Sequence, residues 1–172
     1  MNVNALTQEV EKARKLAPEE LNLIQRAFDF AQKAHQNQKR KSGEPYFIHC
    51  FETAFKVAEW RLDAETVAAA LLHDTVEDAG INLEEIKKEF GEEIAFLVEG
   101  VTKLGRLKYR TSEEKQAENL RKMFLAVSRD IRVVLIKLAD RLHNMKTLKF
   151  LTVLKQKRIA LETSEIYAPL AY

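Results

Sequence analysis

Apolar residues recur at spacings of three and four over most of the chain, which is the period of one face of an α-helix. Four stretches show it well: Leu21, Ile24, Phe28, Ala31 and His35; Ile48, Phe51, Phe55, Ala58 and Leu62; Ile94, Leu97, Val98 and Val101; and Leu120, Phe124 and Val127. Two short apolar runs, VTKL and IRVVLIKL, resemble strands in isolation, but each continues a helical pattern. The pattern therefore predicts an all-α protein.

Local signals mark where these helices begin and end. Pro18 with Glu19 and Glu20 is typical of a first helical turn, because proline suits that position and acids favour the positive end of the helix dipole. We expect N-caps at Asp63, Asn82 and Asp130 and a capping box formed by Thr111 and Glu114. Gly91 is expected to end a helix. A last helix is expected from about Lys155, with Ile159 and Ile166 on it. Asn37–Pro45 is the strongest loop signal, and Gly105–Arg110 is expected to be a basic connector. Nothing divides the chain, so we expect one domain.

Composition narrows the classes of protein that the chain can represent. Its 172 residues include only five glycines and three prolines, well under half the usual combined share of about 12%. This disfavours a turn-rich β-sandwich and excludes collagen and flexible linkers. With 46% hydrophobic and 31% charged residues, the chain suits amphipathic helices and not disorder. The balance of 28 Lys and Arg against 26 Asp and Glu argues against a surface that binds a nucleic-acid duplex.

The cellular compartment is predicted from features that the sequence lacks. The one cysteine, Cys50, cannot form an internal disulfide, which suits a reducing compartment. The first residues, MNVNALTQEVEKARK, lack the apolar run of a signal peptide. No stretch approaches the roughly 20 apolar residues of a membrane span. We therefore expect a cytoplasmic protein without a membrane partner.

The first candidate site lies where an apolar, alanine-rich helix ends in titratable residues. In LLHDTVED, four such groups follow one another within six positions: His73, Asp74, Glu77 and Asp78. Helical spacing places His73 over Glu77, and three acids at a helix C-terminus oppose the dipole unless a cation is present. Imidazole and carboxylate donors suit a divalent metal such as Mn, Fe, Co, Zn or Mg. The alternative is a solvated acidic helix end.

A second candidate is a polar stripe on the helix predicted from Ile131 to Thr147. Lys137, Asp140, Asn144 and Thr147 share one face of this helix. Alone, the stripe would be an ordinary exposed face. The apolar neighbours of Asp140, which include Leu138 and Leu142, indicate instead a buried carboxylate, which would be costly without a partner. We expect Val134, Leu135, Leu138 and Leu142 to be core residues, and Arg141 and His143 to have surface or structural roles.

A third candidate is the cationic loop Lys39–Tyr46 and the histidine that follows it. Lys39, Arg40 and Lys41, with Ser42 and a glycine, could hold phosphates and a base, since arginine both stacks and forks onto phosphate. A solvated charge run and a structural His49 are the alternatives. In combination, His49, His73, Asp74 and Asp140 come from three separate helices, as a metal site in a helical bundle requires.

Five segments carry a resemblance to a known family. Taken together, RKSGEPYFIH, AALLHDTVED, VTKL, IKLADRLHNM and ETSEIYAPLA resemble the amino-terminal hydrolase domain of the bifunctional RelA/SpoT-type (long Rel) alarmone enzymes, which belongs to the HD superfamily of metal-dependent phosphohydrolases. The resemblance covers about residues 21 to 172. It implies an HD-type helical bundle with a metal site between helices, forming one hydrolase domain over residues 1–172.

The same resemblance implies an activity and a role for each candidate residue. Such domains bind one Mn²⁺, with other divalent metals possible, and remove the 3′-pyrophosphate of ppGpp or pppGpp to give GDP or GTP, which degrades the stringent-response alarmone. By motif, His49, His73, Asp74 and Asp140 would be the metal ligands, and Glu77 and Asp78 would position or deprotonate the attacking water. Arg40, Lys41, Ser42, Asn144 and Thr147 would bind the guanine nucleotide.

Two departures from the family pattern qualify the resemblance. Cys50 follows His49 where family members usually have proline, so the backbone there could be slightly relaxed. The chain stops at Tyr172, where family members continue into a synthetase domain and regulatory domains; the ending favours an excised domain over a natural hydrolase-only protein. Two other functions stay open: an HD phosphohydrolase for another nucleotide, and a catalytically silent regulatory module that binds the alarmone.

Overall fold

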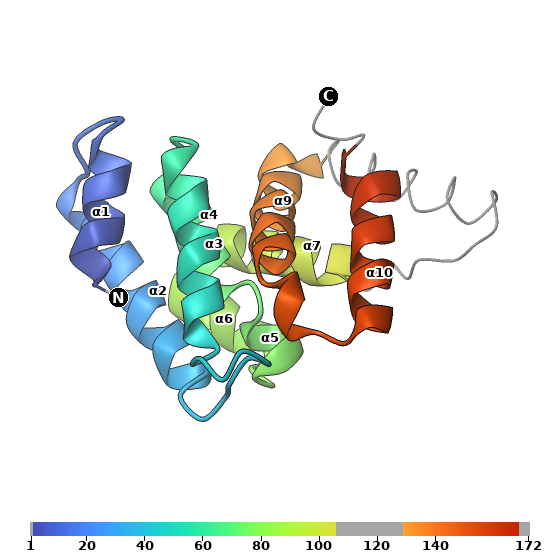
Figure 1. The fold of residues 1–172 in the computed structure, drawn as a ribbon. Coiled ribbons are helices and arrows are strands. Elements are labelled where there is room, and N and C mark those ends of the chain that lie inside the picture. Colours follow the sequence, from blue (N-terminus) through green and yellow to red (C-terminus); the bar gives the residue numbers. More distant parts are fainter. Residues whose placement is uncertain (1, 106–128, 169–172) are drawn as a thin grey trace.

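The structure is a computed structural model that describes residues 2–105 and 129–168 (Figure 1). Within these residues the chain is helical, and the isolated bridge between Lys39 and Pro45 is the only β-type pairing. The elements are α1 (Val3–Glu11), α2 (Pro18–Ala34), α3 (Phe47–Glu59), α4 (Ala64–Leu72), α5 (Thr75–Asp78), α6 (Leu83–Phe90), α7 (Glu92–Gly105), α9 (Ile131–Lys146), η1 (Leu148–Phe150), α10 (Val153–Glu162) and η2 (Thr163–Tyr167). The all-α prediction is confirmed.

The alanine-rich helix α4 is the centre of the bundle. Every residue of α4 except Glu65 is buried, and the helix packs against α2, α3 and α7. Small alanine side chains let the neighbouring helices approach closely, and burying them costs little conformational entropy. Because α4 is enclosed on several sides, the residues at its C-terminal end lie inside the bundle.

Helix α9 completes the site by packing on α3 and α7. Its close approach to α7 depends on Gly100, because a Cβ atom there would lie 2.8 Å from Cγ2 of Val133. Figure 1 shows the order of the helices across the molecule, from α1 and α2 at one end to α9 and α10 at the other. Asp140, on the polar stripe of α9, lies 3.2 Å from Nε2 of His49 in the first turn of α3.

The predicted helix boundaries are largely confirmed. The side chains of Asp63, Asn82 and Asp130 each accept a hydrogen bond from a backbone N–H in the first turn of α4, α6 and α9. Pro18 begins α2, and Gly91 ends α6 with a φ of +92°, a conformation that glycine adopts without strain. None of the helices in the described part of the chain is both long and apolar enough to cross a membrane.

Some expectations differ from the structure. Leu142 is 38% exposed because it borders a surface groove between α3 and α9, so its assignment to the core is wrong. The N-terminal helix α1 had no counterpart in the sequence analysis, and the last helix begins at Val153, two residues before the expected Lys155. The connector after Gly105, the capping box and the helix with Phe124 lie outside the described residues.

Candidate metal centre and nucleotide cleft

The segment before α3 is a tight backbone hairpin. The N–H of Arg40 donates to the carbonyl of Glu44 (2.8 Å), and the N–H of Tyr46 donates to the carbonyl of Gln38 (2.9 Å). The turn between them contains Gly43, with a φ of +89°. The hairpin holds Arg40 and Tyr46 at the site and delivers His49, a buried residue, to the first turn of α3.

Helix α4 ends inside the predicted His/Asp cluster. The helix stops after Leu72, whose carbonyl accepts a hydrogen bond from Oγ1 of Thr75 at 2.7 Å, and one further turn follows as α5. His73 and Asp74 lie in the break and are buried, whereas Glu77 and Asp78 on α5 are exposed. The prediction that His73 lies over Glu77 required one continuous helix, but the structure interrupts that helix between Leu72 and Thr75.

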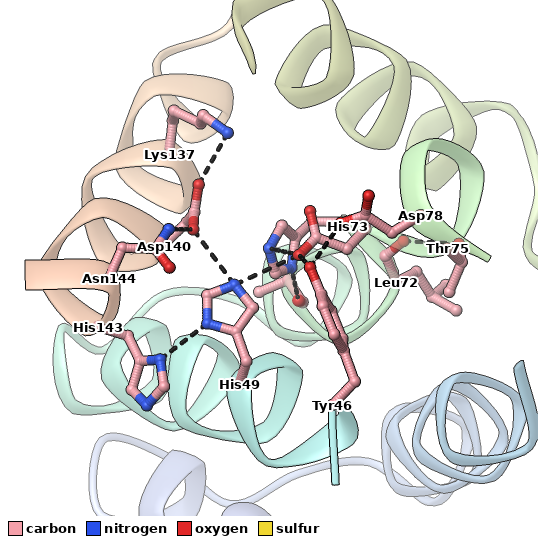
Figure 2. A network of polar contacts seen from close by, with 12 residues as sticks. Tyr46, His49, Leu72, His73, Thr75, Asp78, Lys137, Asp140, His143 and Asn144 are labelled. Atoms are coloured by element: carbon pink, nitrogen blue, oxygen red, sulfur yellow. Dashed lines mark hydrogen bonds and ion pairs between the residues drawn. The ribbon is translucent and has the colours of Figure 1, made fainter. Parts of the chain in front are cut away.

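The four predicted metal ligands converge from three segments of the chain, and Figure 2 shows His49, His73 and Asp140 among them. Nε2 of His49 lies 3.3 Å from Oδ2 of Asp74 and 3.2 Å from Oδ1 of Asp140. Nε2 of His73 lies 3.1 Å from the same Asp74 oxygen. All four residues are at most 9% exposed. Ligand atoms of His49, His73 and Asp140 lie within 4.8 Å of one another, so one ion could contact them together.

The hydrogen bonding of His73 fits a bound cation. Nδ1 of His73 lies 2.7 Å from the carbonyl oxygen of Ala70; a carbonyl only accepts, so Nδ1 carries the hydrogen and donates. When the ring is neutral, Nε2 presents its lone pair toward Oδ2 of Asp74, 3.1 Å away, with no hydrogen between the two atoms. Burial alone would lower the pKa of His73, but Asp74 outweighs it and raises the pKa. The site therefore favours a positive charge at Nε2, which a divalent ion would supply.

Each oxygen of Asp140 contacts one other residue of α9. Nζ of Lys137 lies 2.7 Å from Oδ2, and Nδ2 of Asn144 donates to Oδ1 at 2.5 Å. Burial opposes ionisation of Asp140, but Lys137 and His49 outweigh it and hold its pKa well below the usual range. Lys137 is also buried, and its ion pair with Asp140 raises the pKa of the ammonium. The predicted burial of Asp140 is confirmed, and Oδ1 is the oxygen that faces the other ligands.

Tyr46 connects Asp74, a predicted metal ligand, to Asp78 of the exposed acidic pair, a role that the sequence analysis did not assign. Its hydroxyl lies 2.9 Å from Oδ2 of Asp74 and 2.5 Å from Oδ2 of Asp78. Burial, Asp74 and Asp78 together raise the pKa of Tyr46, so the phenol stays protonated and donates. Nε2 of Gln38 donates to the backbone carbonyl of Asp78 at 2.6 Å. Asp78 is thus fixed through its side chain and its backbone.

A cationic cleft adjoins the His/Asp cluster. The cleft has a volume of about 460 Å³ and is lined by Lys39, Arg40, Lys41, Ser42, Tyr46, Asp78, Asn144, Thr147, Phe150, Leu151 and Lys155. A smaller polar pocket of about 170 Å³ lies over the cluster and is lined by Arg40, Tyr46, His49, Asp74, Glu77, Asp78, Lys137, Asp140 and Asn144. Four residues border both cavities: Arg40, Tyr46, Asp78 and Asn144. The two cavities are therefore adjacent.

The structure brings together all five residues that were expected to bind the nucleotide. The guanidinium of Arg40 donates to Oδ1 of Asn144 at 2.8 Å and to Oγ1 of Thr147 at 3.2 Å, which joins the hairpin to α9. Lys41 and Ser42 line the same cleft. Lys155 and Phe150 also line it, and sequence reasoning missed them because they follow α9 with no motif of their own.

Cys50 does not disturb the geometry of its neighbour His49. Helix α3 runs without a break through Cys50, and the side chain is completely buried. Burial and the nearby Asp74 raise the pKa of the thiol, so it stays protonated. Sγ of Cys50 lies within 4.8 Å of ligand atoms of His73 and Asp74.

His143 lies behind His49 and was not among the predicted site residues. Its Nδ1 lies 2.8 Å from Nδ1 of His49, and the two ring centroids are 4.9 Å apart. Burial, His49 and Arg40 lower the pKa of His143 to about 4. The histidine lies three residues after Asp140, on the same side of α9, and that spacing is the signal that could have identified it.

Several known proteins are similar in sequence to most of this chain. A guanosine-3′,5′-bis(diphosphate) 3′-pyrophosphohydrolase from Aquifex aeolicus (strain VF5) is 53% identical over 168 residues, which are 98% of this chain and 24% of that protein. The enzyme of the same name from Vibrio cholerae serotype O1 (strain ATCC 39315 / El Tor Inaba N16961) is 52% identical over 157 residues, 91% of this chain and 22% of that protein. A GTP pyrophosphokinase from Myxococcus xanthus is 52% identical over 155 residues, 88% of this chain and 20% of that protein. The chain thus spans about a quarter or less of the length of these relatives.

A solved structure and a family model extend the comparison to the fold. The structure, described as a metazoan ortholog of SpoT that hydrolyzes ppGpp, has a TM-score of 0.69 and 22% sequence identity, and the match covers 88% of this chain and 85% of that chain. At this identity the likeness concerns the fold. The family model described as HD domain matches residues 27–172, the region that contains the four converging His and Asp side chains. The chain therefore belongs to the HD domain family.

Proposed function

We propose that this chain is a Mn²⁺-dependent hydrolase that removes the 3′-pyrophosphate of ppGpp or pppGpp, giving GDP or GTP and pyrophosphate. The observation that carries the proposal is that the polar pocket over the buried His/Asp cluster shares four lining residues with a neighbouring cleft. That cleft contains four basic residues, Lys39, Arg40, Lys41 and Lys155. A nucleotide with two diphosphates needs both a cationic cleft and a cation at the scissile group. The names of the relatives support the same substrate.

In this proposal one ion is held by His49, His73, Asp74 and Asp140. Two imidazoles and two carboxylates suit Mn²⁺ and other divalent metals of similar hardness. When bound, the ion would lower the pKa of a coordinated water and neutralise phosphate charge. Lys137 would keep Oδ2 of Asp140 engaged, so that this ligand offers Oδ1 alone.

The cleft would hold the nucleoside and its phosphates. Arg40 would contact the nucleotide while Asn144 and Thr147 fix its guanidinium, and Lys41 and Ser42 would add a charge and a hydroxyl. Phe150 and Leu151 supply apolar surface for the base. The volume of about 460 Å³ is within the range of small-molecule sites.

The chemical step would use the acidic pair at the mouth of the smaller pocket. Glu77 and Asp78 would orient the attacking water and accept its proton, with Asp78 held by Tyr46. The water oxygen would bond to the phosphorus attached to the ribose 3′ oxygen and remain in the pyrophosphate. The bond to the 3′ oxygen would break, and that oxygen would take up a proton. A well-placed base contributes about 10²- to 10⁴-fold to the rate.

We also infer that residues 1–172 act as one hydrolase domain, because α2, α3, α4, α7 and α9 share one core. Synthesis of the alarmone is not assigned to this chain. The partner is expected to be the free nucleotide, with no nucleic acid or membrane involved. The cytoplasmic location stays a prediction.

The test is an assay of the purified chain with ppGpp and Mn²⁺. Pyrophosphate and GDP should appear in equal amounts, and a chelator should stop the reaction. Replacing Asp140 by Asn should have the same effect as the chelator, whereas replacing the exposed Lys103 by Met should leave the rate unchanged. Metal-dependent binding of ppGpp without release of pyrophosphate would support a silent regulatory module. Turnover of another nucleotide, with none of ppGpp, would support a different HD phosphohydrolase.

A further inference from the structure

The two histidines of the proposed metal site are oriented by different means. His73 lies just past the C-terminal end of α4, where the last carbonyls of a helix have no partner within the helix. Its Nδ1 donates to one of them, the carbonyl of Ala70, at 2.7 Å. This bond fixes the ring and leaves Nε2 free to face the carboxylates. The orientation of His73 is therefore local to its own helix.

His49 cannot be oriented in the same way, because it lies in the first turn of α3. The unpaired backbone groups at a helix N-terminus are N–H donors, and a ring N–H needs an acceptor. The acceptor for His49 must therefore come from another element. In the structure the group opposite its Nδ1 is Nδ1 of His143, on α9, at 2.8 Å (Figure 2).

The pairing of these two nitrogens sets the tautomer of both rings. A distance of 2.8 Å requires one hydrogen between the two nitrogens, on one of them only. Nε2 of His49 faces Asp74 and Asp140 and must offer a lone pair to bind a metal. Its hydrogen then belongs on Nδ1, and His143 must accept at Nδ1 and carry its own hydrogen on Nε2.

His143 is separated from the substrate side of the site. It is not among the described residues that line either the cationic cleft or the smaller polar pocket. It borders instead a groove of about 140 Å³ between α3 and α9, which is also lined by Phe55, Leu142 and Lys146. The side chain of His143 therefore reaches the proposed metal site through its contact with His49.

We propose that His143 is a positioning residue that holds His49 in the tautomer able to bind the metal. The inference rests on the metal site of the proposed function. It also explains how a ligand on α3 depends on α9, since α9 supplies both the ligand Asp140 and, three residues later, the acceptor for His49. Partners that orient metal-binding histidines typically contribute about 10- to 100-fold to metal affinity.

The test compares two replacements of His143 that differ in one acceptor. Asn places a side-chain oxygen near the position of Nδ1, and Leu has similar volume but no acceptor. The dissociation constant for Mn²⁺ is measured by calorimetric titration, together with the melting temperature in EDTA. We expect His143→Leu to weaken Mn²⁺ binding by about 10- to 100-fold, with kcat largely recovered at saturating Mn²⁺. His143→Asn should bind Mn²⁺ nearly as well as the unmodified chain.

A control and a second variant separate this role from folding. Lys146→Ala changes the same groove without touching His49 and should leave Mn²⁺ affinity unchanged. If the Leu variant fails to fold, His143→Ala removes the acceptor without adding bulk. Equal Mn²⁺ affinity in the Leu or Ala variant and the unmodified chain would overturn the inference while leaving the metal site intact.

The outcomes also distinguish the inference from the proposed function. If the unmodified chain binds no Mn²⁺ or other divalent ion, the metal site and this inference are both wrong. If it binds Mn²⁺ with the expected dependence on His143 but releases no pyrophosphate from ppGpp, the inference stands and the proposed reaction is wrong.

Discussion

The buried ion pair between Lys137 and Asp140 offers a quantitative test of the site. Replacing Lys137 by Met keeps most of the side-chain volume and removes the charge. Asp140, 5% exposed, would then lie close to Asp74 without its cation. Removing one partner of a buried pair usually costs about 3–5 kcal/mol. We expect the lower end, about 3 kcal/mol, because Asn144 and His49 still contact Oδ1 of Asp140.

The expected loss is measurable as a change in melting temperature. For a chain of this size, 1 kcal/mol corresponds to about 2–4 °C, so Lys137→Met should lower the melting temperature in EDTA by about 6–12 °C. Adding Mn²⁺ should reduce the difference in melting temperature between Lys137→Met and the unmodified chain. The reason is that the ion would neutralise Asp140 in place of the lost Lys137 ammonium. Thermal unfolding followed by circular dichroism, with and without Mn²⁺, measures both effects.

A matched control comes from the surface of α7. Lys103 and Glu99 form an ion pair of the same length, 2.7 Å, with both side chains more than 40% exposed. Exposed pairs contribute about 0–1 kcal/mol, so Lys103→Met should leave the melting temperature nearly unchanged. If Lys137→Met destabilised the metal-free protein no more than Lys103→Met, the electrostatic account of the site would be refuted.

Three further predictions address the reaction and the pH dependence of stability. Glu77→Gln should retain Mn²⁺ affinity and lower kcat by about 10²- to 10⁴-fold; a rate near that of the unmodified chain would contradict its role as base. Arg40→Ala should raise KM by about tenfold or more with a smaller change in kcat, since hydrogen bonds to charged groups contribute about 1.5–3 kcal/mol. An unchanged KM would contradict the role of Arg40 in binding the nucleotide. The pKa of Glu20 is lowered to about 2 by its hydrogen bonds with Arg14 and the N–H of Ala17. Its ionised form therefore stabilises the fold above about pH 4.5, and this contribution is lost as the pH falls toward 2. Glu20→Gln should lower the melting temperature at pH 7 but make little difference near pH 2, and a constant difference would contradict this assignment.

Features that depend on near neighbours could be predicted from the sequence. The caps at Asp63, Asn82 and Asp130 are contacts within one helical turn, so the residue type and its place before an apolar run suffice. The face shared by Lys137, Asp140 and Asn144 follows from helical geometry, and the contacts of Asp140 with Lys137 and Asn144 confirm it. The all-α class is likewise a consequence of spacing within each helix.

Features that depend on packing between helices could not be predicted in this way. Leu142 has the spacing of a core residue, but α3 leaves a groove beside it. The partners of Tyr46 and His143 could not be predicted from the sequence, because Asp78 and His49 are 32 and 94 residues away. Periodicity describes one helix at a time and contains no information about which helix lies opposite.

The sequence by itself therefore determined the helical class, the helix caps and the inventory of possible ligands. The tertiary structure decided which of those ligands meet. It breaks α4 at His73, brings α9 against α3, and places Nε2 of His49 between two carboxylates from different helices. The physical reason is that caps and apolar faces arise from interactions within a turn or two of one helix. A site that binds a metal needs buried donors from several helices, and only the packing of the core sets their separation.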